Sequence, residues 1–336
     1  MNAAPGMEGS LVTVALPRPD PSPPRRVITE VLSRADRAFR RVTTGAGLAM
    51  LAILVVIGFF LVYRAVPAFQ VSGFGFFTTV RFDAASGDLG VLGLLYGTIV
   101  VAVIAVLVAV PLSILAALYL TEYSSGRIRG FLTGLVDLLA AIPSLLYGLW
   151  GFSFVGPKIA PISQWMSDNF GWFPPFARQE NALYINSMVI AGLIVSLMVL
   201  PITTSVIREV FAQTPPGEKE AALALGSTRW GMVRTVMLPF GRGGIIGGSM
   251  LGLGRALGET IAVSLLLPQV PEITTHFLQF GGATISGFIA TNAGASGLAL
   301  NGLMACGLVL FVFTLATNFT ASMIISKSRS GVGVDA

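Results

Sequence analysis

The sequence has few of the residues on which soluble enzymes most often depend. It contains one histidine, one cysteine and three lysines, and only 11% of its 336 residues are charged. The one cysteine, Cys306, cannot form an intramolecular disulfide, and the one histidine, His276, cannot supply an HExxH zinc site. The lysines, at positions 158, 219 and 327, each follow a residue other than glycine, which excludes the Gly-Lys pair of a phosphate-binding P-loop. We therefore expect no catalytic residue, no bound cofactor and no metal in this chain.

Apolar residues, by contrast, make up 54% of the chain, and its mean hydropathy is +0.80. This composition lies outside the range of ordinary soluble domains and is typical of an integral membrane protein. Six stretches are long and apolar enough to cross a bilayer as helices. They lie near 44–66, 92–120, 130–155, 184–207, 243–267 and 298–325. The predicted fold class is therefore all-α, with six transmembrane helices in contact with membrane lipid.

The basic residues indicate which side of the membrane each end occupies. Segments 1–43, 121–130, 208–242 and 326–336 carry 16 of the 21 lysines and arginines, and the segments on the other side carry four. By the positive-inside rule the richer side is cytoplasmic, so both termini are expected there. Residues 17–26 are proline-rich, which favours a partly disordered N-terminal extension over 1–43, and 326–336 form a cytoplasmic tail. The net charge of +5 follows from this topology and does not indicate a nucleic-acid partner.

Two opposite charges lie in the middle of the fifth span, in the sequence LGLGRALGETIAV at 251–263. A charged side chain at that depth costs about 2.5–3.5 kcal/mol, and both Arg255 and Glu259 lie there. On a continuous helix the two share one narrow face with Gly244, Gly248 and Gly252. Because glycines every four residues let another helix approach closely, this face predicts a helix-packing stripe that leads to the charged pair.

The charged pair has a functional and a structural interpretation. At positions i and i+4, Glu259 can neutralise Arg255, whose planar fork of donors suits the oxygens of an oxyanion. We therefore predict a substrate pathway in which Arg255 contacts the anion and Glu259 keeps the arginine oriented. The alternative is a static salt bridge between helices. Asp137, a further charge within a span, is expected to form a hydrogen bond between helices instead of contacting substrate.

The cytoplasmic loop 208–242 is predicted to form two short helices joined at a glycine. Its sequence EAALALGSTRWGMVRTVMLP resembles the EAA loop of ABC-importer permeases. The matching positions are Glu220, Ala221, Ala222, Gly226, Val236, Leu238 and Pro239, where valine replaces the usual isoleucine. The resemblance implies that this loop couples the chain to a separate ATPase subunit, which would use ATP and Mg²⁺.

Two further segments resemble one family of these permeases. IPSLLYGLWGF at 142–152 and LGRALGETIAV at 253–263 are similar to PstC-type permease subunits of the phosphate-specific ABC importer. The sister PstA subunits share RALGET, whereas the preceding LGLG and the following IAV favour PstC. The resemblance implies a type I ABC-importer permease domain over 44–325 that carries inorganic phosphate across the plasma membrane of a prokaryote. It also implies a heterodimer with a PstA-like permease, together with a PstB-like ATPase dimer and a PstS-like binding protein.

Two other functions stay open on the sequence. The EAA loop fits a permease for sulfate or molybdate equally well, and the charged pair within RALGET is what favours phosphate. An ATP-independent secondary transporter that uses Glu259 or Asp137 as a proton carrier is the other class, although no internal repeat supports it. In each case the chain is a transport subunit and not an enzyme.

Overall fold

The computed structural model describes residues 33–178 and 182–329, so most of the predicted N-terminal extension and the end of the predicted tail lie outside the described residues. By its internal contacts the chain divides into two units, residues 1–53 and 54–336. The described part of the first unit is the beginning of helix α1 (Arg34–Ser72). The predicted first span lies within this helix, which begins ten residues before the expected boundary at 44.

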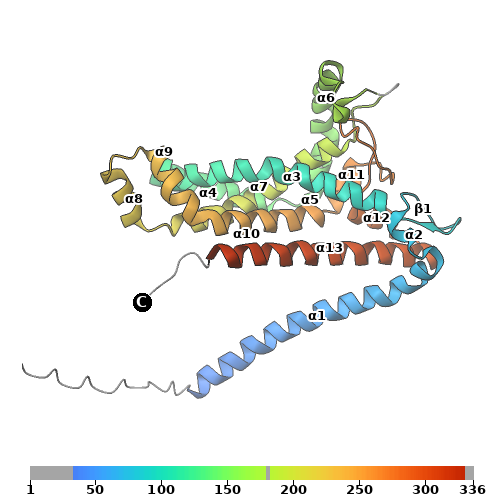
Figure 1. Ribbon diagram of the computed structural model, residues 1–336, viewed down its shortest axis with the longest axis horizontal. Helices are drawn as coiled ribbons and strands as arrows, with labels where there is room; N and C mark the ends of the chain where they lie inside the picture. The colour runs from blue at the N-terminus through green and yellow to red at the C-terminus, as the bar shows by residue number, and fades with distance from the viewer. Residues whose placement is uncertain (1–32, 179–181, 330–336) are drawn as a thin grey trace, which may run out of the picture. The chain divides into compact units, whose positions relative to one another are not determined.

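The second unit is almost entirely helical and carries one small hairpin (Figure 1). Its first half contains α2 (Gly75–Thr78), β1 (Phe82–Asp83), β2 (Asp88–Leu89), α3 (Leu92–Leu118), the π-helical turn η1 (Tyr119–Tyr123), α4 (Gly126–Ala141), α5 (Ser144–Trp150), η2 (Gly151–Val155), α6 (Gly156–Phe170) and η3 (Pro174–Phe176). Its second half contains α7 (Met188–Ala212), α8 (Pro216–Ala224), α9 (Arg229–Met232), η4 (Val233–Met237), α10 (Leu238–Leu257), α11 (Ile261–Leu266), α12 (Ile285–Thr291) and α13 (Gly297–Arg329). The two short strands pair antiparallel, with Phe82 opposite Leu89. The all-α prediction is therefore confirmed.

Five helical runs in the described part of the chain are long and apolar enough to cross a membrane. The predicted third span, 130–155, is not one continuous helix, because the chain turns by 88° between Gly126–Ala141 and Ser144–Phe170. Pro143 lies in this break. Proline lacks a backbone donor and disfavours helical geometry at the residue before it, which explains why α4 ends there. Counted as one span, the bent pair raises the number of spans to six.

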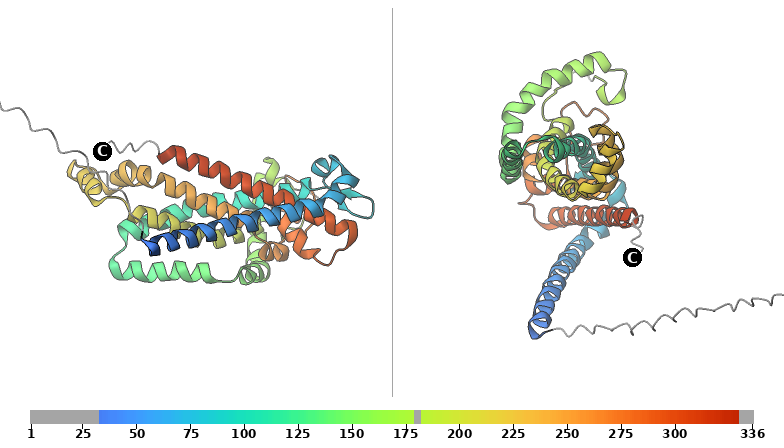
Figure 2. Two further views of the ribbon diagram at one scale, coloured as in Figure 1. Left: turned by 90° about the horizontal axis from the view of Figure 1, so that it is seen from below. Right: turned by 90° about the vertical axis from the view of Figure 1, so that its left-hand side faces the viewer.

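Helices α3, α7 and α10 form the centre of the second unit, and the end-on view in Figure 2 shows them gathered together. Small residues bring α3 and α7 close: Ala105 is fully buried, and a Cβ added at Gly192 would lie 2.6 Å from Cγ2 of Ile104. Ser113 of α3 donates a hydrogen bond of 3.0 Å to the carbonyl of Leu200 in α7. Close backbone packing of this kind is how helices associate inside a bilayer, where lipid chains are as apolar as the side chains.

Candidate functional site

The glycines of α10 face α7. A Cβ added at Gly252 would lie 2.6 Å from Cγ1 of Val199, and one at Gly248 would lie 3.2 Å from Cγ1 of Ile207. At Gly244 another valine of α7 leaves still less room for a side chain. The glycine stripe therefore packs α10 onto a helix of the same chain, and α10 cannot move away from α7 without opening this interface.

The fifth predicted span is interrupted at the charged pair. Helix α10 ends at Leu257, and the next helix, α11, begins at Ile261. Arg255 therefore lies in the last turn of α10, whereas Glu259 lies in the break between the two helices. The two residues therefore do not lie four positions apart on one continuous helix, and no ion pair joins their side chains in the described structure. The prediction that Glu259 neutralises Arg255 is wrong.

Glu259 forms hydrogen bonds instead with residues that follow it in the chain, in α11 and α12. Its side chain is buried, with the residue 8% exposed, and Oε1 accepts a hydrogen bond of 3.3 Å from the N–H of Ala262. The carbonyl of Glu259 accepts a hydrogen bond of 2.6 Å from the hydroxyl of Ser286 in α12. A carboxylate at the start of a helix satisfies a free N–H group there. Glu259 thus holds the first turn of α11 and fixes the break against α12.

Arg255 lacks a matching partner. The residue is half-buried, and its Nε is fully buried without a hydrogen-bond acceptor among the described residues. Its guanidinium lies within electrostatic range of Tyr147 in α5, whose own hydroxyl donates to the carbonyl of Leu139. Leaving a buried donor of this kind unsatisfied costs about 1–3 kcal/mol. The guanidinium therefore keeps a donor that an acceptor group could satisfy.

Asp137 forms a contact between helices. It lies on α4, and the hydroxyl of Ser205 in α7 donates to its Oδ1 over 3.5 Å. The hydrogen bond between helices that we predicted for Asp137 is therefore present, although it is long and lies at an exposed position.

The EAA sequence forms a projecting hairpin. Glu220, Ala221 and Ala222 lie in α8, Gly226 adopts φ +85° in the turn, and Leu238 begins α10 together with Pro239. Only glycine adopts this left-handed geometry at no steric cost. Figure 1 shows α8 and α9 at the end of the second unit opposite to α2 and β1. The hairpin exposes apolar side chains, above all Leu225, which is 89% exposed, and Trp230. Such a surface is typical of a segment that inserts into another protein.

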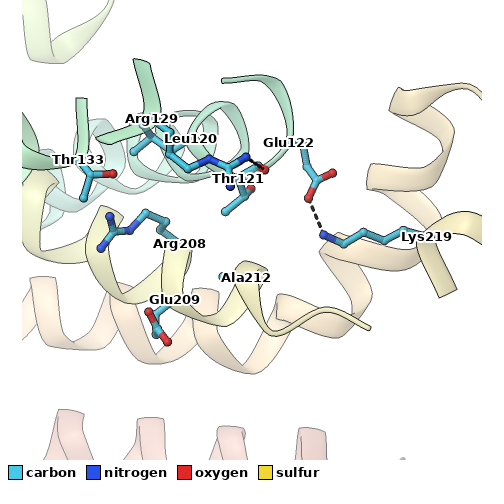
Figure 3. A pocket seen from close by; sticks show the side chains of 9 residues that line it. All are labelled: Leu120, Thr121, Glu122, Arg129, Thr133, Arg208, Glu209, Ala212 and Lys219. Atoms are coloured by element: carbon cyan, nitrogen blue, oxygen red, sulfur yellow. Dashed lines mark hydrogen bonds and ion pairs between the residues drawn. The ribbon is translucent and has the colours of Figure 1, made fainter. Parts of the chain in front are cut away.

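A polar cluster beside this hairpin is missed by sequence reasoning. Lys219 of α8 donates to Glu122 of η1 over 2.6 Å, and their side chains are 19% and 15% exposed (Figure 3). Nη2 of the Arg129 guanidinium in α4 donates to the carbonyls of Thr121 and Ser124 over 2.8 and 3.3 Å. Lys219 and Glu122 are 97 positions apart along the chain, so no local spacing predicts this ion pair. The only signal is an acidic residue at the polar end of an otherwise apolar helix.

A family model, similar sequences and a solved structure that match this chain are all of transport proteins. The family model described as "binding-protein-dependent transport system inner membrane component" matches residues 109–329. The phosphate transport system permease protein PstC 2 of Mycobacterium tuberculosis is 38% identical over 304 residues, which cover 89% of this chain and 94% of that protein. PstC of Mycobacterium leprae is 38% identical over 92% of this chain and 98% of its own length. Among solved structures, a chain of a bacterial alginate ABC transporter superimposes with a TM-score of 0.55 at 19% identity, covering 86% of this chain and 96% of that one, which shows similarity of fold.

Proposed function

Because the chain belongs to the family of binding-protein-dependent transport system inner membrane components, and within it to the PstC permeases, we propose that it imports inorganic phosphate as one permease subunit of an ABC importer. It is a multi-pass membrane protein and not an enzyme. A permease of this kind works with a second permease subunit, an ATPase and a binding protein. In the proposal these are PstA-, PstB- and PstS-like chains, ATP and Mg²⁺ bind to the ATPase alone, and both termini face the cytoplasm of a prokaryote.

The α8–α9 hairpin is the proposed contact with the ATPase. Its support is the exposed apolar surface around Leu225 and the left-handed turn at Gly226, which gives the two short helices a fixed angle. Ala221 and Ala222 keep the side-chain bulk of α8 low, and Leu238 and Pro239 are the first residues of α10, which follows the hairpin through η4. Movement of the docked hairpin would therefore act directly on the helix that carries Arg255.

Arg255 is the proposed transient contact for the anion. The observation that carries this role is the buried Nε that no described group satisfies. Planar guanidinium groups bind phosphate oxygens through two parallel hydrogen bonds. Because no carboxylate is paired with Arg255 within the residues that the structure describes, a bound anion would supply the acceptor that its guanidinium lacks. Since the expected pairing with Glu259 is absent, Glu259 is proposed as a positioning residue that fixes the break after α10.

The test is uptake of radiolabelled phosphate into proteoliposomes that contain the complete importer, with unlabelled phosphate, sulfate and molybdate as competitors. We expect Arg255→Ala to reduce phosphate uptake at least tenfold, since a charged hydrogen bond contributes about 1.5–3 kcal/mol. Arg127→Ala is the matched control, because Arg127 is exposed in the first turn of α4. If Arg255→Ala assembles with the ATPase and imports at the wild-type rate, Arg255 is not the contact.

The same preparation distinguishes the other functions. Competition by sulfate or molybdate that exceeds competition by phosphate would identify a permease for a different oxyanion. Transport that persists in orthovanadate, by a chain that purifies without any ATPase, would contradict an ABC importer altogether.

A further inference from the structure

A cavity of about 390 Å³ with several charged side chains in its lining lies beside the α8–α9 hairpin, which we call the coupling hairpin. It is formed where η1, α4, α7 and α8 meet, and Figure 3 shows the side chains that line it. Its polar lining includes Thr121, Glu122, Arg129, Thr133, Arg208 and Lys219. The cavity lies at the ends of the apolar runs of α3 and α7, where the headgroup region of a bilayer begins.

The charges in this cavity are unequally neutralised. Lys219 and Glu122 neutralise each other at 2.6 Å. Glu209 also lines the cavity, but in Figure 3 its carboxylate points away from Arg129 and Thr133. Neither acidic side chain of the lining therefore neutralises Arg129: Glu122 is paired with Lys219, and Glu209 points away from Arg129.

Two guanidinium groups in the lining have no carboxylate partner among the described residues. Arg129 donates only to backbone carbonyls, which orient the group without neutralising it. Arg208 of α7 is half-buried and forms no hydrogen bond or ion pair within the described part of the chain. Two like charges that line one cavity repel each other unless an anion lies between them.

We propose that this cavity binds a phosphoryl oxyanion, held by Arg208 and Arg129. Guanidinium groups recognise phosphoryl oxygens in pairs of parallel hydrogen bonds, and the Thr133 hydroxyl adds a further donor at the wall. Two sources share this chemistry: the headgroup of an anionic phospholipid, which basic pockets at helix ends bind, and inorganic phosphate. The site is separate from the proposed contact at Arg255 and does not rest on it.

The experiment uses the full chain, purified with the subunits that accompany it. One arm reconstitutes it in phosphatidylcholine nanodiscs with and without phosphatidylglycerol, and native mass spectrometry counts the retained lipid. The other arm measures binding of radiolabelled inorganic phosphate in detergent without anionic lipid, in an Arg255→Ala background, so that binding at Arg255 does not contribute. Each arm compares the unchanged cavity with Arg208→Gln and with Arg127→Gln. Arg127 is exposed, lies two residues before Arg129 and does not line the cavity.

Arg208→Gln is expected to weaken binding at least about tenfold in one arm, while Arg127→Gln leaves it unchanged. Retained phosphatidylglycerol that is lost in Arg208→Gln identifies a lipid headgroup, and phosphate binding that is lost identifies the free anion. Arg129→Gln is the second variant, in case Arg208→Gln fails to assemble with its partners. The proposal is overturned if the unchanged cavity binds neither probe, or if Arg208→Gln and Arg129→Gln bind as tightly as Arg127→Gln.

Discussion

The ion pair between Lys219 and Glu122 is predicted to transmit movement of the coupling hairpin to α3. Lys219 belongs to α8 and Glu122 to η1, the direct continuation of α3, and their charged atoms lie 2.6 Å apart. Exposed pairs contribute at most about 1 kcal/mol, whereas losing one partner of a buried pair costs about 3–5 kcal/mol. Since these side chains are 19% and 15% exposed, we expect an intermediate value of about 1.5 kcal/mol, equivalent to roughly a tenfold change in rate.

The variants are Lys219→Glu, Glu122→Lys and the exchanged pair that carries both substitutions. Phosphate uptake and vanadate-sensitive ATP hydrolysis are measured together in proteoliposomes. Each single variant should lose about tenfold in uptake per ATP hydrolysed, and the exchanged pair should recover most of this loss because the opposite charges face each other again. Glu218→Gln is the control, since Glu218 is exposed on the same helix. The exchanged pair also keeps the net charge of the cavity, which separates this effect from anion binding there.

Two results would refute the reasoning. If both single variants assemble and transport with the wild-type ratio of uptake to ATP hydrolysis, the pair transmits nothing. If the exchanged pair is as defective as the single variants, the loss comes from the individual side chains and not from their interaction.

Two further predictions concern the fifth helical run. Gly252→Ala should destabilise the protein by about 1–3 kcal/mol in thermal unfolding, because its Cβ would collide with Val199. Gly130→Ala on α4 is the control and should not destabilise it, because no atom lies within 4 Å of the added Cβ. Equal melting temperatures of the two variants would contradict the glycine packing. Glu259→Ala should lower the free energy of unfolding by about 0.5–2 kcal/mol, because the first turn of α11 loses its cap. Since the two side chains are unpaired, this effect should add to that of Arg255→Ala within about 0.5 kcal/mol. A strongly non-additive double variant would show that they interact.

Local patterns in the sequence predict the hairpin well. The first helix and the glycine turn depend on neighbouring residues alone, and Gly226 adopts the left-handed geometry that its position requires. The second helix is not short as predicted, because α9, η4 and α10 continue as one helical run from Arg229 to Leu257. The spans are likewise predicted from apolar composition, although the bounds shift where helices continue past the apolar stretch. Helix α1 begins at Arg34 and α13 extends to Arg329, both beyond the predicted spans.

The charged pair could not be predicted in the same way. A helical wheel assumes an unbroken helix, and on that assumption Arg255 and Glu259 share a face. The break at Gly258 depends on two contacts formed by folding: the Glu259 carboxylate with the N–H of Ala262, and the Glu259 carbonyl with Ser286 from α12. The second contact spans 27 positions. No periodicity within the span contains this information, so the sequence predicts the wrong geometry for these two residues.

The corrected geometry changes how release of the anion should be understood. Glu259 is hydrogen-bonded to the backbone. Release of an anion from the proposed contact at Arg255 would therefore not depend on exchange between the anion and a neighbouring carboxylate. Helices α9 and α10, with η4 between them, form one helical run from Arg229 to Leu257. At about 1.5 Å per residue, roughly 39 Å of continuous helix separates Arg229 in the hairpin from Arg255. A displacement of the docked hairpin would therefore be carried along one helical run to the arginine, and the glycine stripe would make α7 move with it. If Arg255 has the proposed role, the ATPase would change the affinity for the anion by moving the arginine itself.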